Sequence, residues 1–188
     1  IIFNARNSNK FLGAKPGEIW SLLLSPEHTA GLNVLIRAME LGTKPVTIDQ
    51  AADYTAIVPT QLYRALNGDE KLLKHLQGCK AVLVGGAATE NELLDAAKKN
   101  GISCVTTYGM TETSGGCVYN GVPLPGVEIK IDGTIQIRGE MLARVPLQNG
   151  FFVTNDLGYL ENGKLFVTGR ADDVIISGGK NVSLSAVE

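Results

Sequence analysis

The residues best suited to chemistry lie in the run Thr107-Tyr108-Gly109-Met110-Thr111-Glu112, which follows an apolar segment, residues 102–105. The hydroxyl of Thr111 can donate a hydrogen bond to a phosphate oxygen, and Gly109 lets a ligand approach the backbone closely. Glu112 would repel a phosphate directly, but it could hold a Mg²⁺ ion between the two groups. The run therefore predicts a site for a nucleotide phosphate, with Thr111 and Glu112 as catalytic candidates and Glu112 as metal ligand. The alternative is a polar loop after a buried strand.

A second candidate is the turn Gly85-Gly86-Ala87, which closes the continuous apolar segment 81–84. In a parallel sheet the carboxyl ends of the strands share one edge, where ligands bind. The turn and the 107–112 run would then lie close together, and the bare glycine backbone would leave room for a flat base. A plain strand-to-helix turn is the alternative.

Three charged residues further along the chain could complete a nucleotide site. Asp156 could accept hydrogen bonds from both hydroxyls of a ribose, and Arg170 offers a fixed cation for ribose or phosphate. Asp172 lies where the sequence pattern changes again. The alternatives are a turn aspartate for Asp156 and a charged hinge without a ligand for the last two residues.

The elements that must position these residues show two different patterns. Up to about residue 119, continuous apolar segments alternate with amphipathic ones, as is typical of a parallel sheet covered by helices on both faces. We expect the last of these helices, residues 90–100, to begin with a capping box formed by Thr89 and Glu92 and to end at Gly101. The other expected elements are strands at 19–24, 55–58, 81–84 and 102–105 and helices at 31–41 and from 61 to 66.

After Gly121, apolar residues alternate with polar ones over 127–131 and 135–137, which predicts a hairpin that turns at Asp132-Gly133. A second hairpin is predicted to turn at Asn162-Gly163, between the segments 158–160 and 165–167. The sequence thus predicts an α/β fold, with a parallel sheet flanked by helices and then a small antiparallel β-barrel-like unit. We expect an α/β subdomain that binds nucleotide and acyl group over 1–119, the β unit over 120–171, and a hinge with the start of a largely absent lid over 172–188.

The composition excludes several classes of protein. The net charge is −2 without a basic cluster, which argues against a nucleic-acid partner or an acidic membrane surface. The apolar stretches are too short to insert into a membrane, and no signal peptide opens the chain. The cysteines at positions 79, 104 and 117 lack metal-ligand spacing, so we expect structural thiols in a reducing cytoplasm. A homo-oligomer is compatible with the sequence.

The motifs above, in this order, resemble the adenylate-forming family of acyl-CoA synthetases, luciferases and peptide-synthetase adenylation domains. The resemblance covers residues 28–188 and implies part of the large N-terminal domain of such a ligase. It implies that the 107–112 run binds phosphate and Mg²⁺, that the Gly85-Gly86-Ala87 turn lines the adenine, and that Asp156 holds the ribose with help from Arg170. It also implies that Asp172 is the hinge of a C-terminal lid. The substrates would be ATP, coenzyme A and a small-molecule carboxylic acid.

Within that family, the stretches 28–32, 58–62 and 121–126 are most similar to the o-succinylbenzoate–CoA ligases of menaquinone synthesis. Their acid carries two carboxylates and a ketone, so a cation in the acyl pocket would help, and Arg37 is a candidate. However, Arg37 lies with Asn33 off the apolar stripe of its helix, which favours an exposed side chain. The resemblance places the ring of His28 over the acyl site and makes His28 a further catalytic candidate, the alternative being a helix cap. His75 has no such context, and we expect it on the surface.

The main hypothesis is therefore an ATP-dependent ligase that converts 2-succinylbenzoate to 2-succinylbenzoyl-CoA through an acyl-adenylate, with AMP and pyrophosphate as products. One alternative is a ligase for another aryl or fatty acid. The other is a nucleotide-binding module without catalysis, if the chain is naturally this short. The resemblance places a phosphate-binding loop before Ile1 and a lid lysine after Glu188, and Asn155 stands where the family usually has glycine.

Overall fold

The computed structural model describes the backbone of residues 1–177 and 180–183 and the side chains of residues 1–172. Its centre is a six-stranded sheet whose strands lie side by side in chain order. The first four strands are parallel, and the last two are antiparallel to their neighbours. They are β1 (Trp20–Ser21), β2 (Tyr54–Ile57), β3 (Ala81–Val84), β4 (Cys104–Met110), β5 (Gly115–Tyr119) and β6 (Val122–Pro123).

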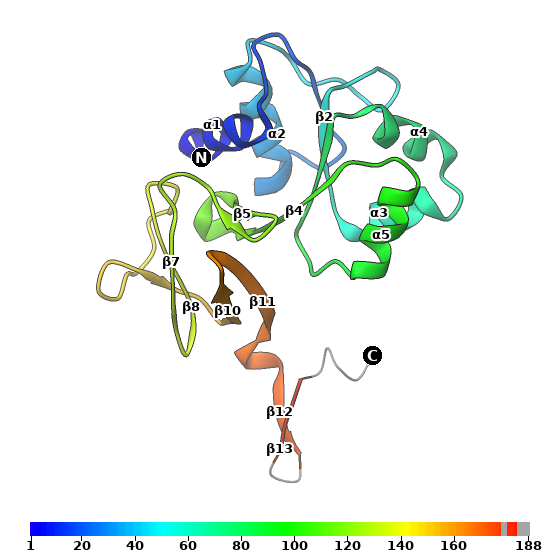
Figure 1. Cartoon of the computed structure of the whole chain (residues 1–188). Helices are drawn as coiled ribbons and strands as arrows, with labels where there is room; N and C mark the ends of the chain where they lie inside the picture. The colour runs from blue at the N-terminus through cyan, green and yellow to red at the C-terminus, as the bar shows by residue number, and fades with distance from the viewer. Residues whose placement is uncertain (178–179, 184–188) are drawn as a thin grey trace.

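Helices cover both faces of the parallel strands (Figure 1). Ala81 and Leu83 of β3 pack in one apolar cluster with α2, whereas Val82 and Val84 pack in another with α3, α4 and α5. Since side chains alternate across a strand, the two clusters lie on opposite faces. The helices are α1 (Ile2–Leu12), α2 (Thr29–Glu40), α3 (Pro59–Leu66), α4 (Glu70–Gly78) and α5 (Asn91–Lys99). No helix in the described part of the chain has both the length and the apolar character to cross a membrane.

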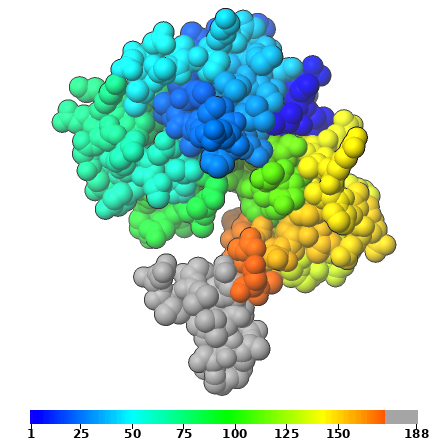
Figure 2. Space-filling model, turned by 180° about the vertical axis from the view of Figure 1, so that it is seen from behind, coloured from blue at the N-terminus to red at the C-terminus, as the bar shows by residue number. Residues whose placement is uncertain are grey.

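The next five strands form a smaller antiparallel unit that packs against β5 through a third cluster, in which Cys117 and Val118 meet Ile135 and Ile137. A three-stranded sheet joins β7 (Glu128–Asp132), β8 (Thr134–Arg138) and β9 (Phe152–Val153). Two hairpins follow, β10 (Asp156–Glu161) with β11 (Lys164–Arg170) and β12 (Val174–Ser177) with β13 (Lys180–Ser183). In Figure 2, the surface is hollowed between the α/β body above and the orange end of β11 below.

The predicted α/β class, the parallel sheet and both hairpins are confirmed. Asn162 and Gly163 both adopt positive φ, as the tight turn between β10 and β11 requires. The segment expected as a strand at 19–24 forms only two residues of β1. The predicted capping box is wrong, because α5 begins after Glu90 without any side-chain cap bond. The boundaries at 120 and 172 stay predictions, and Gly178-Gly179 with the end of the expected lid segment lies outside the described residues.

Candidate functional site

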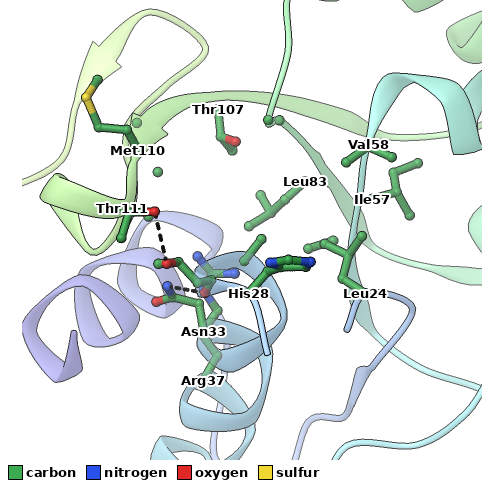
Figure 3. A pocket seen from close by; sticks show the side chains of 18 of the residues that line it. Leu24, His28, Asn33, Arg37, Ile57, Val58, Leu83, Thr107, Met110 and Thr111 are labelled. Carbon is green, nitrogen blue, oxygen red and sulfur yellow. Dashed lines mark hydrogen bonds between the residues drawn. The ribbon is translucent and has the colours of Figure 1, made fainter. Parts of the chain in front are cut away.

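A cavity of about 380 Å³ opens at the carboxyl ends of β2, β3 and β4, beside the first turns of α2. Figure 3 shows Thr111 and Asn33 on one side of it and Val58 and Ile57 on the other. Of the residues predicted from the sequence, the lining includes His28, Arg37, Gly85, Gly86, Thr107, Gly109, Met110, Thr111 and Glu112. It does not include Ala87, Tyr108, Asp156, Arg170 or Asp172.

The central motif is not the polar loop that was the alternative interpretation of the 107–112 run. Residues 107–110 belong to β4, and Thr111–Thr113 form a 3₁₀ turn. The hydroxyl of Thr113 bonds to the amide and carbonyl of Met110 at 2.8 and 3.0 Å, and the amide of Ala143 donates to the carbonyl of Glu112 at 2.8 Å. The backbone that carries Thr111 and Glu112 is therefore fixed on both sides.

At each of the glycines near the strand ends, the structure shows why a side chain would not fit. A Cβ on Gly85 would overlap Oγ1 of Thr107, and Gly86 has φ +87°, which a side chain would strain. A Cβ on Gly109 would overlap the carbonyl of Gly115 on β5. Gly109 does line the cavity, but the close approach that requires glycine is to the neighbouring strand rather than to a ligand.

Asp156 lies next to the motif although it does not line the cavity. It is 9% exposed and accepts a hydrogen bond of 2.7 Å from the hydroxyl of Tyr108, whose pKa is raised by burial and by that carboxylate. A guanidinium nitrogen of Arg170 lies 3.6 Å from the other carboxylate oxygen of Asp156. Arg170 also pairs with Asp172 through two bonds of 2.8 and 2.9 Å, which lower the pKa of Asp172. The structure thus links the three charged residues in one chain of contacts.

Arg37 is buried, which corrects the expectation of an exposed side chain. It is 4% exposed, its Nη2 donates to the hydroxyl of Tyr119 at 2.9 Å, and its guanidinium lies 5.1 Å from the ring centre of Trp20. Its Nε has no hydrogen-bond partner among the described residues, and burial lowers its pKa. Thr29, Asn33 and Arg37 lie four residues apart on one face of α2, and all three line the cavity. This polar face of the helix is therefore directed toward the site and not toward solvent.

The two histidines differ from each other in burial. His28 is exposed, lines the cavity and is the N-cap residue of α2, but its side chain makes no capping bond. His75 is buried rather than on the surface, and its Nε2 lies 2.7 Å from the hydroxyl oxygen of Ser21. Burial lowers the pKa of His75, so its neutral form is favoured in this packed position.

The cavity suits Mg²⁺ that arrives with a nucleotide. Glu112 is the one carboxylate that lines it, and the described residues contain no cluster of three or more side chains suited to hold a metal alone. Mg²⁺ is commonly held by one or two carboxylates together with substrate phosphates. Glu112 therefore fits the ion, provided that phosphate supplies the other ligands.

Sequence reasoning missed two residues of the site. Tyr119 holds Arg37, but it lies on β5, which was not expected. Asn33 was noted only for its position beside Arg37, yet it is 1% exposed and lines the cavity. The spacing of Thr29, Asn33 and Arg37, four residues apart, was the available signal.

Comparison with known proteins agrees with this geometry. The model of the family described as AMP-binding enzyme matches residues 4–146. The probable 2-succinylbenzoate–CoA ligase of Mycobacterium tuberculosis is 41% identical over 205 aligned residues, covering 92% of this chain and 53% of that protein. This chain therefore spans about half the length of the curated relatives it matches.

Solved structures of o-succinylbenzoate CoA synthetase from Bacillus subtilis also resemble this chain. The complex with the acyl-adenylate intermediate has a TM-score of 0.87 at 27% identity and covers 99% of this chain and 48% of that one. The complex with ATP and magnesium ion has a TM-score of 0.86, with the same identity and coverage. With its cavity at the strand ends and a family match over most of its length, the chain belongs to the family of AMP-binding enzymes.

Proposed function

We propose that this chain is the nucleotide- and acyl-binding part of an AMP-forming acyl-CoA ligase, and that its acid is 2-succinylbenzoate. The observation that carries the proposal is that one cavity brings Thr111 and Glu112 together with Arg37. The guanidinium of Arg37 is buried and contacts Tyr119 rather than a carboxylate among the described residues, which is costly unless an anion pairs with it. A second carboxylate on the acid would supply that anion while the first one reacts.

The proposed reaction has two steps. The carboxylate of the acid attacks the α-phosphorus of ATP, a carboxylate-oxygen-to-phosphorus bond forms, and the bond to the pyrophosphate oxygen breaks. Coenzyme A then attacks the acyl carbon through its thiol, and AMP leaves. Mg²⁺ held by Glu112 would offset the charge on the phosphates. Little covalent work falls to the protein, so positioning and electrostatics supply most of the catalysis.

Each residue of the site has a proposed role. Thr111 donates to a phosphate oxygen, Gly85, Gly86 and Ala87 lie along the adenine, and Asp156 with Arg170 holds the ribose. Arg37 binds the distal carboxylate of the acid, and His28 lies at the open side of the acyl site. Asp172 would be the hinge of a lid domain. The proposed location is the cytoplasm, in keeping with the three free cysteines at positions 79, 104 and 117.

Exchange of radiolabelled pyrophosphate into ATP by the protein tests the first step directly. We expect exchange that depends on 2-succinylbenzoate and is weak with benzoate or with a fatty acid. Strong exchange with a fatty acid alone would instead assign a different acyl-CoA ligase. Nucleotide binding without exchange for any acid would assign a binding module.

The metal assignment has its own test. Glu112→Ala should lower the rate of adenylation on the order of a hundredfold or more, since it removes the charge that anchors Mg²⁺ in the transition state. Glu90→Ala, an exposed carboxylate before α5, is the matched control and should leave the rate unchanged. A loss under about threefold in Glu112→Ala would remove Glu112 from the metal site.

A further inference from the structure

We infer that Asn33 is a positioning residue for the phosphate side of the cavity, and that Asn4 assists it from the other side. The inference rests on the proposed function, because it concerns how Thr111 and Glu112 are held in place. Both asparagines are 1% exposed. They come from α2 and α1, helices that pack against each other, and both reach the turn formed by residues 111–115.

The two side chains meet at a single carbonyl group. Nδ2 of Asn33 donates to the carbonyl of Ser114 at 2.8 Å, and Nδ2 of Asn4 donates to the same carbonyl at 3.0 Å. Asn4 also donates to the carbonyl of Thr113 at 3.1 Å. Two helices thus fix the direction of the last carbonyls of the turn, directly after Glu112.

The backbone of this turn needs such support. Ser114 has φ +53°, a left-handed conformation that costs free energy for a residue with a side chain, and Gly115 has φ +101°. A Cβ on Gly115 would crowd Nδ2 of Asn33 at 2.7 Å, so the asparagine lies against bare backbone. The hydroxyl of Ser114 donates to the carbonyl of Met141 at 2.6 Å, so the turn is also held by the segment around residue 141.

Asn33 also connects this turn to α2, which carries Arg37. Its Nδ2 donates to the carbonyl of Thr29 at 2.8 Å, and the hydroxyl of Thr29 lies 3.4 Å from that of Thr111 (Figure 3). Both partners of Nδ2 are carbonyl oxygens, so only the amide nitrogen can face them. Oδ1 of Asn33 is buried without a hydrogen-bond partner among the described residues, so the structural value of this side chain lies in its donors.

The variant Asn33→Asp distinguishes a positioning role of Asn33 from a role in packing alone. Asn33→Asp keeps the shape of the side chain, but its ionised form has no proton to donate to the carbonyls of Thr29 and Ser114. The protonated form can donate one. We therefore expect Asn33→Asp to lose at least tenfold in the maximal rate of pyrophosphate exchange at pH 8, and to recover part of that loss as the pH falls toward 6. The comparison is the ratio to the wild-type rate at each pH.

Asn33→Ala and Asn4→Ala complete the test. We expect each to lower the maximal rate and raise the KM for ATP at least fivefold, with the KM for the acid within about twofold, because a displaced reacting group costs rate far more than it costs acid binding. Asn67→Ala is the matched control, since exposed Asn67 also donates to a carbonyl four residues earlier, that of Tyr63, away from the cavity. Asn67→Ala should match the wild type in all three quantities.

The rates are taken per folded molecule, with the unfolding midpoint of each variant measured in parallel. Wild-type kinetics in Asn33→Ala, or a rate ratio for Asn33→Asp that does not change with pH, would overturn the inference. If the variants at position 33 do not fold, Asn4→Ala decides, because it reaches the same carbonyl without lining the cavity. Failure of the proposed function would look different, since the wild-type protein itself would then show no exchange.

Discussion

The hydroxyl of Tyr108 donates a hydrogen bond of 2.7 Å to Asp156, and this bond joins the central sheet to the smaller β unit. Tyr108 belongs to β4 and precedes Thr111 by three residues, whereas Asp156 begins β10. The amide of Asp156 is held in turn by the hydroxyl of Thr154 at 3.0 Å. The orientation of the carboxylate proposed to hold the ribose thus depends on a residue of the proposed phosphate motif.

Removing this one hydroxyl should weaken nucleotide binding without disturbing the fold. Tyr108→Phe keeps the buried ring and leaves Asp156 without its donor. A hydrogen bond to a charged group contributes about 1.5–3 kcal/mol, so we expect the dissociation constant for AMP to rise roughly tenfold or more. Isothermal titration calorimetry measures this, with Tyr63→Phe, an exposed tyrosine of α3, as control. An unchanged affinity in Tyr108→Phe would disconnect the bond from the nucleotide.

The sequence predicted the strands well because their physical signal is local. The continuous apolar segment Ala81–Val84 is buried on both faces, as such segments are in parallel sheets. The helix α1 was missed because its buried face is mostly polar. Asn4, Ser8 and Asn9 are all buried, and their partners lie far away in the sequence, such as the hydroxyl of Tyr119 at 2.6 Å from that of Ser8. Only the tertiary fold supplies those partners.

The same reason explains which site residues could be predicted. Nine of the predicted site residues line the cavity, and seven of them do so because motif and strand end coincide at one sheet edge, whereas His28 and Arg37 come from the N-terminus and body of α2. Arg37 was expected to be exposed because a charged residue off an apolar stripe usually faces water. Here that face of α2 closes on Trp20 and Tyr119, which the pattern of α2 alone cannot reveal.

The proximity of Arg37 to Trp20 gives a spectroscopic test of the acyl site. Trp20 is the single tryptophan of the chain, is fully buried and has the guanidinium 5.1 Å from its ring centre. A carboxylate that pairs with Arg37 changes the electric field at the indole, so titration with 2-succinylbenzoate should give a saturable change in tryptophan emission. Benzoate should give a much smaller one, since it has no second carboxylate.

Substitution at position 37 should abolish that signal. We expect Arg37→Met to show no saturable change and to raise the KM for the acid at least tenfold, because it loses a charge-assisted hydrogen bond. Arg64→Met, which removes an exposed arginine paired with Asp69, is the control. An emission response that survives in Arg37→Met would place the second carboxylate elsewhere.

A side chain at Gly85 should weaken nucleotide binding. In Gly85→Ala the new Cβ overlaps Oγ1 of Thr107, so β3 and β4 must shift at the cavity edge. We expect the affinity for AMP to fall on the order of tenfold or more, since a displacement of about 1 Å at a site is costly. Gly85→Ala combined with Thr107→Ala removes the overlapping oxygen and should regain part of the affinity.

Gly78 at the end of α4 is the matched control for that substitution. A Cβ there meets nothing within 4 Å. Gly78→Ala should therefore leave AMP binding unchanged and raise the free energy of unfolding by about 0.4–1 kcal/mol, through the lower entropy of the unfolded chain. Equal losses of affinity in both variants would contradict the steric explanation.

At the amino end of β3, away from the cavity, Lys80 links two carboxylates and should make the stability of the fold depend on pH. Its ammonium lies 2.6 Å from Glu18 and 2.8 Å from Asp53. The bond from Lys80, followed by bonds from the amide of Lys15 and the hydroxyl of Tyr54, lowers the pKa of Glu18 from 4.5 to about 2. Because the folded state favours the ionised form, this contribution is fully present above pH 4.5 and is lost as the pH falls from 4.5 through about 2.

Lys80→Met removes the largest cause of that pKa shift. The variant should be less stable than the wild type at pH 7, and the difference between the two should shrink as the pH falls below 4.5. Urea unfolding followed by tryptophan emission at pH values from 7 to about 3 measures the difference, in which carboxylates common to both proteins cancel. Lys130→Met, at an exposed pair with Asp132, should keep the wild-type pH profile, because such pairs contribute little. Parallel curves for the wild type and Lys80→Met would show that Lys80 does not couple the protonation of Glu18 to folding.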